Sequence, residues 1–203
     1  MAFEDREEAA KQLIGKLSEY KGKNPLILAI PRGAVPMGKM IAEALQGELD
    51  VVLVHKIGAP GNPEYAIGSI DEQGNIHMNE DAPPVNQAHI EETAKAELAT
   101  LKKRRETYGK EPIDPKDRIV IIVDDGIATG STMLAAVRSI RSSKPEKLIV
   151  AIGVAPPESI KRLEQEVDEV ICIQAPRMFF AVGQFFANFP QVSDDEVIET
   201  LKK

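Results

Sequence analysis

The stretch "IVIIVDDGIATGSTM", residues 119–133, joins an apolar run to two adjacent carboxylates and a loop of small residues. The run 119–123 is typical of a buried strand, and it ends at Asp124 and Asp125. In an open parallel sheet, ligands bind beyond the carboxyl ends of the strands. We therefore expect this strand to carry both acids out of the core, to a binding site at the edge of the sheet.

The small-residue loop that follows has the composition of a phosphate cradle. Backbone N–H groups and the N-terminus of a helix would converge near Ser131. The hydroxyls of Thr129, Ser131 and Thr132 add donors, while Gly126 and Gly130 permit close approach to a ligand. The loop is not a Walker sequence, because Ser131 follows Gly130 with no lysine between them.

The two carboxylates need a different partner, since they would repel a bare phosphate. Vicinal hydroxyls of a sugar can donate hydrogen bonds to carboxylates. A ribose 5-phosphate fits this chemistry, with its phosphate in the loop and its hydroxyls on Asp124 and Asp125. The structural alternative is an acidic turn that caps a helix, but such a turn would need only one Asp and no glycine pair.

The rest of the chain alternates apolar runs with helix-like segments. Buried strands are expected over 25–30, 50–57, 118–125, 147–155 and 169–175, and helices over 5–20, 35–47, 87–108, 131–143 and 157–166. This alternation predicts an α/β fold, with a parallel-stranded central sheet and helices on both faces.

Glycines and prolines mark the breaks between these elements. Gly47 is expected to close the helix 35–47. The segment "GAPGNPE" (58–64) is expected to be irregular, because it carries Gly or Pro at almost every second position. Residues 65–80 read as two extended runs joined around Gly74, as in a hairpin.

Composition limits the choice of function. A chain of 203 residues with 43% apolar residues suits one well-buried domain, and its single cysteine excludes an intramolecular disulfide. The net charge of −7 argues against a nucleic-acid partner, and the basic run "KKRR" (102–105) is typical of a solvated helix face. No apolar run reaches the roughly 18 residues of a membrane span, and no signal peptide is recognisable. A cytoplasmic protein without membrane contact is expected.

The stretch 120–133 resembles the phosphoribosyl pyrophosphate signature of the type I phosphoribosyltransferases, which has apolar residues, two acids and a small-residue loop ending in T-G-x-T. "LAIPRGAVPMG" (28–38) is similar to the pyrophosphate loop of that family, where the peptide between a pair such as Arg32 and Gly33 is often cis-like. By itself this stretch is a strand-to-helix turn, with a guanidinium suited to a diphosphate.

Two further stretches extend the resemblance. "VLVHKIGAPGNPE" (52–64) resembles the strand that enters the flexible loop of the family, with Lys56 where pyrophosphate is often met; a surface lysine is the alternative. "PRMFFAVGQFF" (176–186) is similar to the carboxyl-terminal hood of hypoxanthine-type members, and Phe180 would stack on the base. Five phenylalanines fall within 179–189, and core packing or a subunit interface explains that cluster equally well.

Two departures argue against hypoxanthine or guanine as the substrate. Ala128 stands where hypoxanthine-type members have an Asp, and Ala187 lies near the place of the acid that reads the base. Ala128 is compatible with adenine-like or orotate-like members. The loop signature does not choose between these.

The resemblance implies a Mg²⁺-dependent transfer of ribose 5-phosphate from phosphoribosyl pyrophosphate to a nitrogenous base, as in nucleotide salvage, with release of pyrophosphate. Asp124 and Asp125 would contact the ribose and, mostly through water, the metal. Lys56 would neutralise the pyrophosphate. The substrate-binding residues would be Arg32, Gly33, Gly126, Ala128, Thr129, Gly130, Ser131, Thr132 and Phe180.

Residues 58–66 are expected to form a mobile lid over the site. Glu64, the only carboxylate of this lid, is the candidate for contacting the acceptor base or its leaving proton, and a solvated loop residue is the alternative.

Residues 1–203 are expected to form a single domain and to assemble as a homodimer. A hood would come from the C-terminal segment 175–203, alone or together with the insert 65–110. The alternative function is a regulatory protein that binds phosphoribosyl pyrophosphate without catalysis, and a purely structural α/β domain is the third option.

Overall fold

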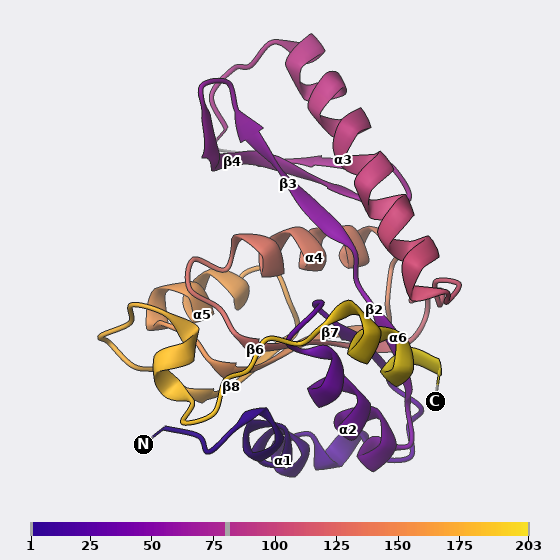
Figure 1. The fold of residues 1–203 in the computed structure, drawn as a ribbon, viewed down its shortest axis with the longest axis vertical. Helices are drawn as coiled ribbons and strands as arrows, with labels where there is room; N and C mark the ends of the chain where they lie inside the picture. Colours follow the sequence, from indigo (N-terminus) through magenta and orange to yellow (C-terminus); the bar gives the residue numbers. More distant parts are fainter. Residues whose placement is uncertain (1, 80–81, 203) are drawn as a thin grey trace.

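The computed structural model (Figure 1) describes residues 2–79 and 82–202. For residues 63 and 64, within the first of these ranges, it describes only the backbone. Its centre is a five-stranded sheet of order β2-β1-β6-β7-β8, in which every pairing is parallel. The strands are β1 (Leu26–Ala29), β2 (Glu48–Val51), β6 (Ile119–Gly126), β7 (Lys147–Val154) and β8 (Glu169–Gln174). The expected α/β fold class is confirmed.

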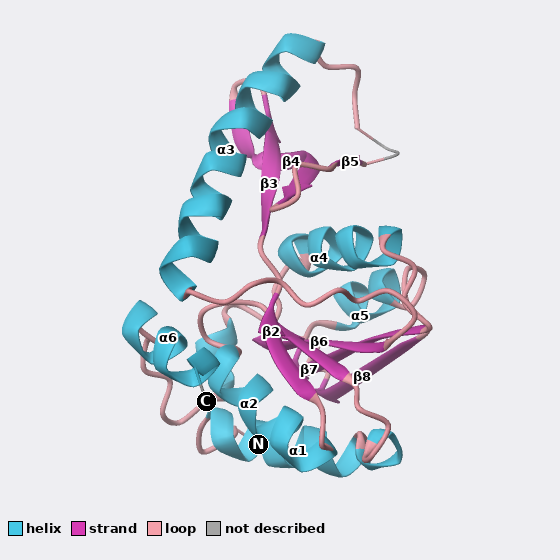
Figure 2. Cartoon of the chain, turned by 90° about the vertical axis from the view of Figure 1, so that its right-hand side faces the viewer, coloured by secondary structure: helices cyan, strands magenta, loops and turns pink. Residues whose placement is uncertain are grey.

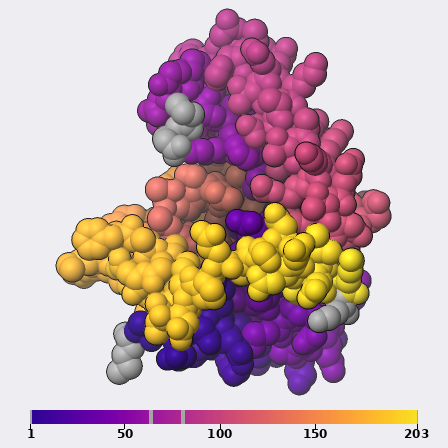
Figure 3. All heavy atoms as spheres, in the orientation of Figure 1, coloured from indigo at the N-terminus to yellow at the C-terminus, as the bar shows by residue number. Residues whose placement is uncertain are grey.

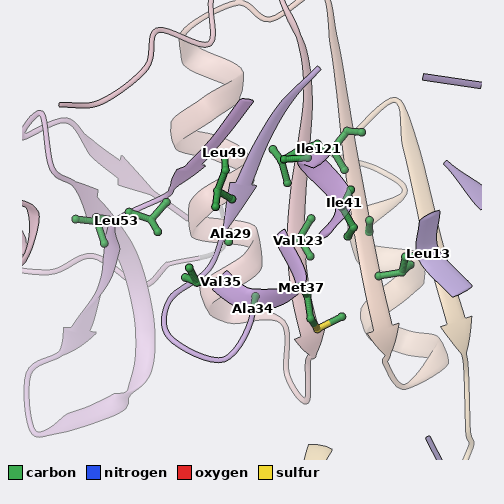
Figure 4. Packing of buried hydrophobic residues seen from close by; sticks show 14 of the residues in the cluster. Leu13, Ala29, Ala34, Val35, Met37, Ile41, Leu49, Leu53, Ile121 and Val123 are labelled. Atoms are coloured by element: carbon green, nitrogen blue, oxygen red, sulfur yellow. The ribbon is translucent and has the colours of Figure 1, made fainter. Parts of the chain in front are cut away.

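Helices cover both faces of this sheet (Figure 2). They are α1 (Arg6–Lys16), the 3₁₀ turn η1 (Ser18–Tyr20) and α2 (Val35–Leu45) on one face, and α4 (Ser131–Ser142) and α5 (Pro157–Leu163) on the other. Successive residues of a strand point to opposite faces. Ile121 and Val123 therefore pack toward α1 and α2 (Figure 4), whereas Val120 and Ile122 belong to the core under α4 and α5. Burial on both faces explains why these strands are continuously apolar.

The segment between β2 and β6, residues 52–118, is called the insert from here on; it is longer than the expected insert 65–110 and lies above α4 in Figure 1. It contains the antiparallel strands β3 (Val54–Ala59), β4 (Asn62–Asp71) and β5 (Ile76–Met78), and the long helix α3 (Gln87–Tyr108). The expectation of one strand over 50–57 is wrong, because the chain leaves the central sheet after Val51 and starts a second sheet at Val54. The run "VVLV" (51–54) contains no turn residue that could mark this change of sheet.

The Gly- and Pro-rich stretch 58–64 is also more regular than expected. Its backbone forms the end of β3, a turn at residues 60–61 and the start of β4, with irregular pairing around Gly58. Gly61 has a φ of +75°, so the glycine serves a tight turn instead of a long loop. The second hairpin, expected around Gly74, is confirmed by the antiparallel pairing of β4 with β5.

The end of one helix and the presence of another differ from the sequence expectation. Gln46 takes the left-handed conformation that ends α2, with a φ of +58°. A Cβ on Gly47 would overlap the Pro25 carbonyl oxygen, so this glycine permits close packing, and its N–H still helps to close the helix by donating to the Ala42 carbonyl oxygen (2.9 Å). The C-terminal helix α6 (Asp194–Lys202) was not expected. Its signal is a capping box, in which Ser193 and Glu196 exchange side-chain to backbone hydrogen bonds.

Arg105 anchors the insert to the central sheet. Its guanidinium donates to Asp50 Oδ1 (2.8 Å) at the end of β2 and to both carboxylate oxygens of Glu72 (2.7 and 2.6 Å). Burial acts to lower the pKa of Arg105, but hydrogen bonds and charges from Glu72 and Asp50 outweigh it and raise the pKa. The side chain of Arg105 is 12% exposed, so the run 102–105 is not wholly a solvated face.

Asp71 anchors the insert a second time, on α4. Its buried carboxylate accepts hydrogen bonds from Ser139 Oγ (3.1 Å) and Asn75 Nδ2 (3.0 Å), and His77 Nε2 lies 3.2 Å away. Burial acts to raise the pKa of Asp71, yet the hydrogen bonds from Asn75, His77 and Ser139 hold it below its ordinary value. The ionised form therefore stabilises the fold.

Asp71→Asn is expected to lower the free energy of unfolding at pH 7 by on the order of 1.5–3 kcal/mol, the range for hydrogen bonds to a charged group. A lowered native pKa contributes stability above the unfolded pKa and loses it as the pH falls through the native pKa. The difference between parent and variant should therefore shrink below about pH 4. Urea unfolding from pH 7 to pH 3 measures this, with the exposed Asp195→Asn as the control. A constant difference across that range would contradict it.

Candidate functional site

The loop after β6 has the geometry of an anion cradle. Gly130, with a φ of +73°, precedes the first residue of α4, and the first-turn N–H groups of a helix have no intrahelical acceptor. Ala128, Thr129 and Thr132 are exposed, and the Thr129 and Ser131 hydroxyl oxygens lie 3.2 Å apart. The loop thus presents hydroxyls and a helix N-terminus to solvent at the carboxyl end of the sheet.

Two side chains of α5 donate hydrogen bonds to backbone carbonyl oxygens of this loop. Ser159 Oγ donates to the Ala128 carbonyl oxygen (2.7 Å), and Arg162 Nη1 donates to that of Thr129 (3.3 Å). Sequence reasoning missed both contacts, because α5 follows the loop only after another helix and strand. Their effect is to hold the carbonyl groups of Ala128 and Thr129 in place on the α5 side of the loop.

The two acids at the end of β6 occupy different surroundings. Asp125 is 7% exposed, and its carboxylate forms an ion pair with Arg6 Nε of α1 (2.7 Å). Asp124 is half-buried, and it accepts the backbone N–H of Asp125 (2.8 Å). Burial and the neighbouring charge of Asp125 raise the pKa of Asp124 well above its ordinary value. The expectation that both acids lie outside the core is wrong for Asp125.

The loop 30–34 lies beside this ion pair. A Cβ on Gly33 would overlap Asp125 Oδ2 and come within 3.1 Å of Arg6 Nη2, so the glycine makes room for the pair. The cis peptide bond joins Pro31 to Arg32, whereas the resemblance to the family's pyrophosphate loop placed it one bond later, between Arg32 and Gly33. The Arg32 side chain is 47% exposed, with Nη1 3.7 Å from Asp194 Oδ2.

Gly33→Ala is expected to cost about 1–3 kcal/mol of stability, as overpacking does, because the Asp125 carboxylate is held by Arg6 and cannot retreat freely. Gly15→Ala is the matched control. Gly15 lies in α1 with open space around it, so the same change should stabilise the protein by about 0.5–1 kcal/mol. Thermal unfolding of both variants measures the contrast. Equal effects would show that the carboxylate moves aside at no cost.

A cavity of about 880 Å³ opens between the insert and the helices α4 and α5. Lys56 and Tyr65 line it from the insert, and Ser131, Arg138 and Arg162 line it from the helices. In Figure 3 the insert forms the upper lobe above α4, and the tail crosses the lower lobe in yellow. Lys56 and Ser131, at the end of the loop after β6, therefore line the same cavity from opposite sides, although 75 positions separate them in the sequence.

The phenylalanine cluster divides into packed and exposed members. Rings of Phe3 and Phe186, of Phe179 and Phe185, and of Phe186 and Phe189 lie 4.8–5.1 Å apart, and these residues join the core. Phe180 is 85% exposed. Core packing explains the rest of the cluster, and stacking by Phe180 stays a prediction.

The remaining predicted positions are Glu64 in the insert and Ala187 in the tail. The backbone of Glu64 lies in β4, and its side chain is outside the described residues. Ala187 donates its N–H to the Phe3 carbonyl oxygen (2.8 Å), so this part of the tail, together with the 3₁₀ turn η2 (Val182–Phe185), lies against the N-terminal segment.

Among the side chains that the structure describes, which exclude that of Glu64, no group of three or more His, Cys, Asp or Glu is placed to hold a metal ion. Over the described ranges 2–79 and 82–202, none of the helices combines the length and the apolar character that crossing a membrane requires.

Comparison with known proteins adds to this geometry. A family model described as a phosphoribosyl transferase domain matches residues 2–189. Rv0571c of Mycobacterium tuberculosis H37Rv, whose name describes it as a phosphoribosyl transferase, is 39% identical across 99% of this chain and 46% of its own length. The chain thus spans about half the length of this curated relative. A uracil phosphoribosyltransferase of Mycoplasma genitalium is 45% identical over 58 residues, which is 29% of this chain and 28% of that protein.

A solved structure extends the likeness to the whole fold. The crystal structure of TT1426 from Thermus thermophilus has a TM-score of 0.92 and 38% sequence identity, covering 99% of this chain and 98% of that one. The family match extends from before α1 to the tail, so it includes both the central sheet and the insert. The chain therefore belongs to the phosphoribosyl transferase domain family, as the sequence resemblance predicted.

Proposed function

We propose that this protein binds phosphoribosyl pyrophosphate and transfers its ribose 5-phosphate to a nitrogenous base, releasing pyrophosphate. The observation that carries the proposal is the loop 126–132, in which Ala128, Thr129 and Thr132 are exposed. It offers a helix N-terminus and three hydroxyls, and it directly follows the acid pair, in which the Asp124 carboxylate is half-buried. An anion and a sugar diol could occupy these two parts at once. Membership of the family supports the same reaction.

Each part of the site has a role in this reaction. The loop would hold the 5-phosphate, Asp124 would accept hydrogen bonds from the ribose hydroxyls, and Arg32 and Lys56 would neutralise the leaving pyrophosphate. The transition state has oxocarbenium character, so the protein contributes positioning, charge neutralisation and exclusion of water. The cavity beside Lys56 has room for the acceptor next to the loop.

The donor set is compatible with Mg²⁺. This ion takes oxygen ligands, keeps several waters and is often bound through one or two carboxylates and substrate phosphates. Asp124 offers such an oxygen at the edge of the site, whereas Asp125 is engaged by Arg6. Asp124 would therefore hold the ion through water, and the ion would supply charge neutralisation to the diphosphate. The role of Asp125 toward the metal stays a prediction.

The acceptor side rests on fewer observations. Phe180 would stack on the base from a hood made by the tail, with the insert as the facing wall. Exposed Phe180 and Met178 also offer apolar surface for a homodimer. Ala128 and Ala187 disfavour hypoxanthine and guanine as acceptors. The protein is proposed to act in the cytoplasm.

Thermal unfolding with phosphoribosyl pyrophosphate and Mg²⁺ tests the binding step. Ligand at 100 times its Kd should stabilise the native state by about 2.7 kcal/mol. No shift at millimolar ligand would contradict the assignment of the site. A panel of purine and pyrimidine bases, assayed for pyrophosphate release, then tests catalysis. Binding without release for any base would favour the regulatory alternative.

A further inference from the structure

Arg6, the first residue of α1, joins the site to the tail of the chain. Its Nε donates to Asp125 Oδ2 (2.7 Å), and its Nη1 donates to the Pro190 carbonyl oxygen (2.6 Å). Its guanidinium carbon also lies 3.8 Å from the centroid of the Phe189 ring. The Arg6 side chain is only 13% exposed, so these contacts hold it in a single place.

The alternation of side chains along β6 separates the two acids, and Arg6 contacts only one of them. Consecutive strand residues point to opposite faces, and the core residues Ile122 and Val123 show which face is which. Asp125 follows the direction of Val123, toward α1, where Arg6 meets it. Asp124 follows the direction of Ile122, toward α4 and the loop. Gly33 packs closely against the same ion pair, since a Cβ there would overlap Asp125 Oδ2.

The tail is tied to the same place by backbone pairing. Phe3 donates its N–H to the Phe185 carbonyl oxygen (2.8 Å), and Asn188 donates its N–H to that of Glu4 (2.8 Å). Phe3 and Phe186 form a parallel bridge. Two residues after Glu4, the side chain of Arg6 adds contacts with Phe189 and the Pro190 carbonyl oxygen. The tail segment 185–190 is therefore fixed relative to the end of β6.

We propose that Arg6 is a positioning residue of the sugar-diphosphate site. By holding Asp125, the residue directly before the loop 126–132, on the α1 side, it fixes the backbone that carries both Asp124 and that loop, and it also locks the tail against the end of β6. This inference rests on the proposed function for its effect on the ligand, but not for its effect on the loop 126–132.

The first experiment measures the Kd of phosphoribosyl pyrophosphate with Mg²⁺ by calorimetry. Arg6→Met should weaken binding by about tenfold or more, because an unpaired buried charge next to the site must find a new partner. Arg6→Lys should recover most of the affinity. Arg6→Met with Asp125→Asn should recover much of it as well, since the charge is then removed. A loss that neither change relieves would overturn the proposal.

The second experiment needs no ligand. In the ¹H–¹⁵N spectrum, Arg6→Met should shift the amide signals of 126–132, and Arg6→Lys should restore them. Lys11→Met is the matched control, because Lys11 forms an exposed ion pair with Glu7 on the same helix. Signals that change only in 185–190 would make Arg6 a tail clamp and overturn the inference.

The two failures can be told apart. If the parent protein does not bind phosphoribosyl pyrophosphate, the proposed function fails, while the amide shifts still decide whether Arg6 positions the loop. If the parent binds and the loop signals of Arg6→Met stay unchanged, the positioning role fails alone.

Discussion

Replacing Arg105 by methionine is expected to lower the free energy of unfolding by about 3–5 kcal/mol, the cost of breaking a buried ion pair by removing one partner. The side chains of Asp50 and Glu72 are 2% and 10% exposed, so water cannot solvate the two carboxylates that would remain. Arg105 also donates to the Val51 carbonyl oxygen (3.0 Å), at the point where the chain leaves the central sheet. Its loss should therefore release the insert as well.

Urea unfolding of parent and variant gives this free energy by linear extrapolation. Arg104→Met is the control, because Arg104 is the exposed neighbour on the same helix, and it should change stability by no more than about 0.5 kcal/mol. If Arg105→Met does not fold, Arg105→Lys keeps the charge with poorer geometry and should give an intermediate loss. Equal stability of the Arg104 and Arg105 variants would show that the two carboxylates find other partners.

Asp124→Asn is expected to weaken binding of phosphoribosyl pyrophosphate by about ten- to hundredfold. The amide keeps the shape of the side chain but loses hydrogen bonds to a charged acceptor, which are worth about 1.5–3 kcal/mol each. The fold should remain intact, because Asp124 is half-buried at the end of β6 and the amide oxygen of Asn can still accept the backbone N–H of Asp125.

Calorimetry with Mg²⁺ present measures this affinity, and Glu199→Gln, a carboxylate-to-amide change at an exposed position of α6, is the control. A variant that binds as tightly as the parent would remove Asp124 from ribose recognition. Asp125→Asn is a different case. It leaves Arg6 without its carboxylate, so a loss of stability is expected together with any loss of binding.

Local sequence signals were enough for the framework of the fold. The runs 26–29, 120–123 and 148–152 of β1, β6 and β7 are continuously apolar and buried, and helical patterns separate them, which is how a parallel sheet covered on both faces is encoded. The cradle after β6 was recognisable for the same reason, because its acids, glycines and hydroxyls are consecutive in the chain.

Contacts between distant residues could not be predicted in this way. Arg6 and Asp125 are 119 positions apart, and nothing near Asp125 indicates that a helix at the start of the chain will neutralise it. Arg105 is similar, since its three neighbours in "KKRR" are exposed and only the fold places it between Asp50 and Glu72. The change of sheet after Val51 was hidden because the apolar run continues through Val52, Leu53 and Val54 with no turn residue.

The pairing of β1 with β6 has a consequence for the order in which the chain folds. Leu26 pairs with Val120, so the middle of the sheet forms only when the two ends of a long segment meet. The entropy lost on closing a loop grows with its length, and an insert that has already folded shortens the flexible part. We expect the neighbouring strands β6, β7 and β8 to assemble early, and β1 to join them last. The folded insert then shortens the flexible segment between β1 and β6, and we expect this shortening to determine how fast β1 joins the sheet.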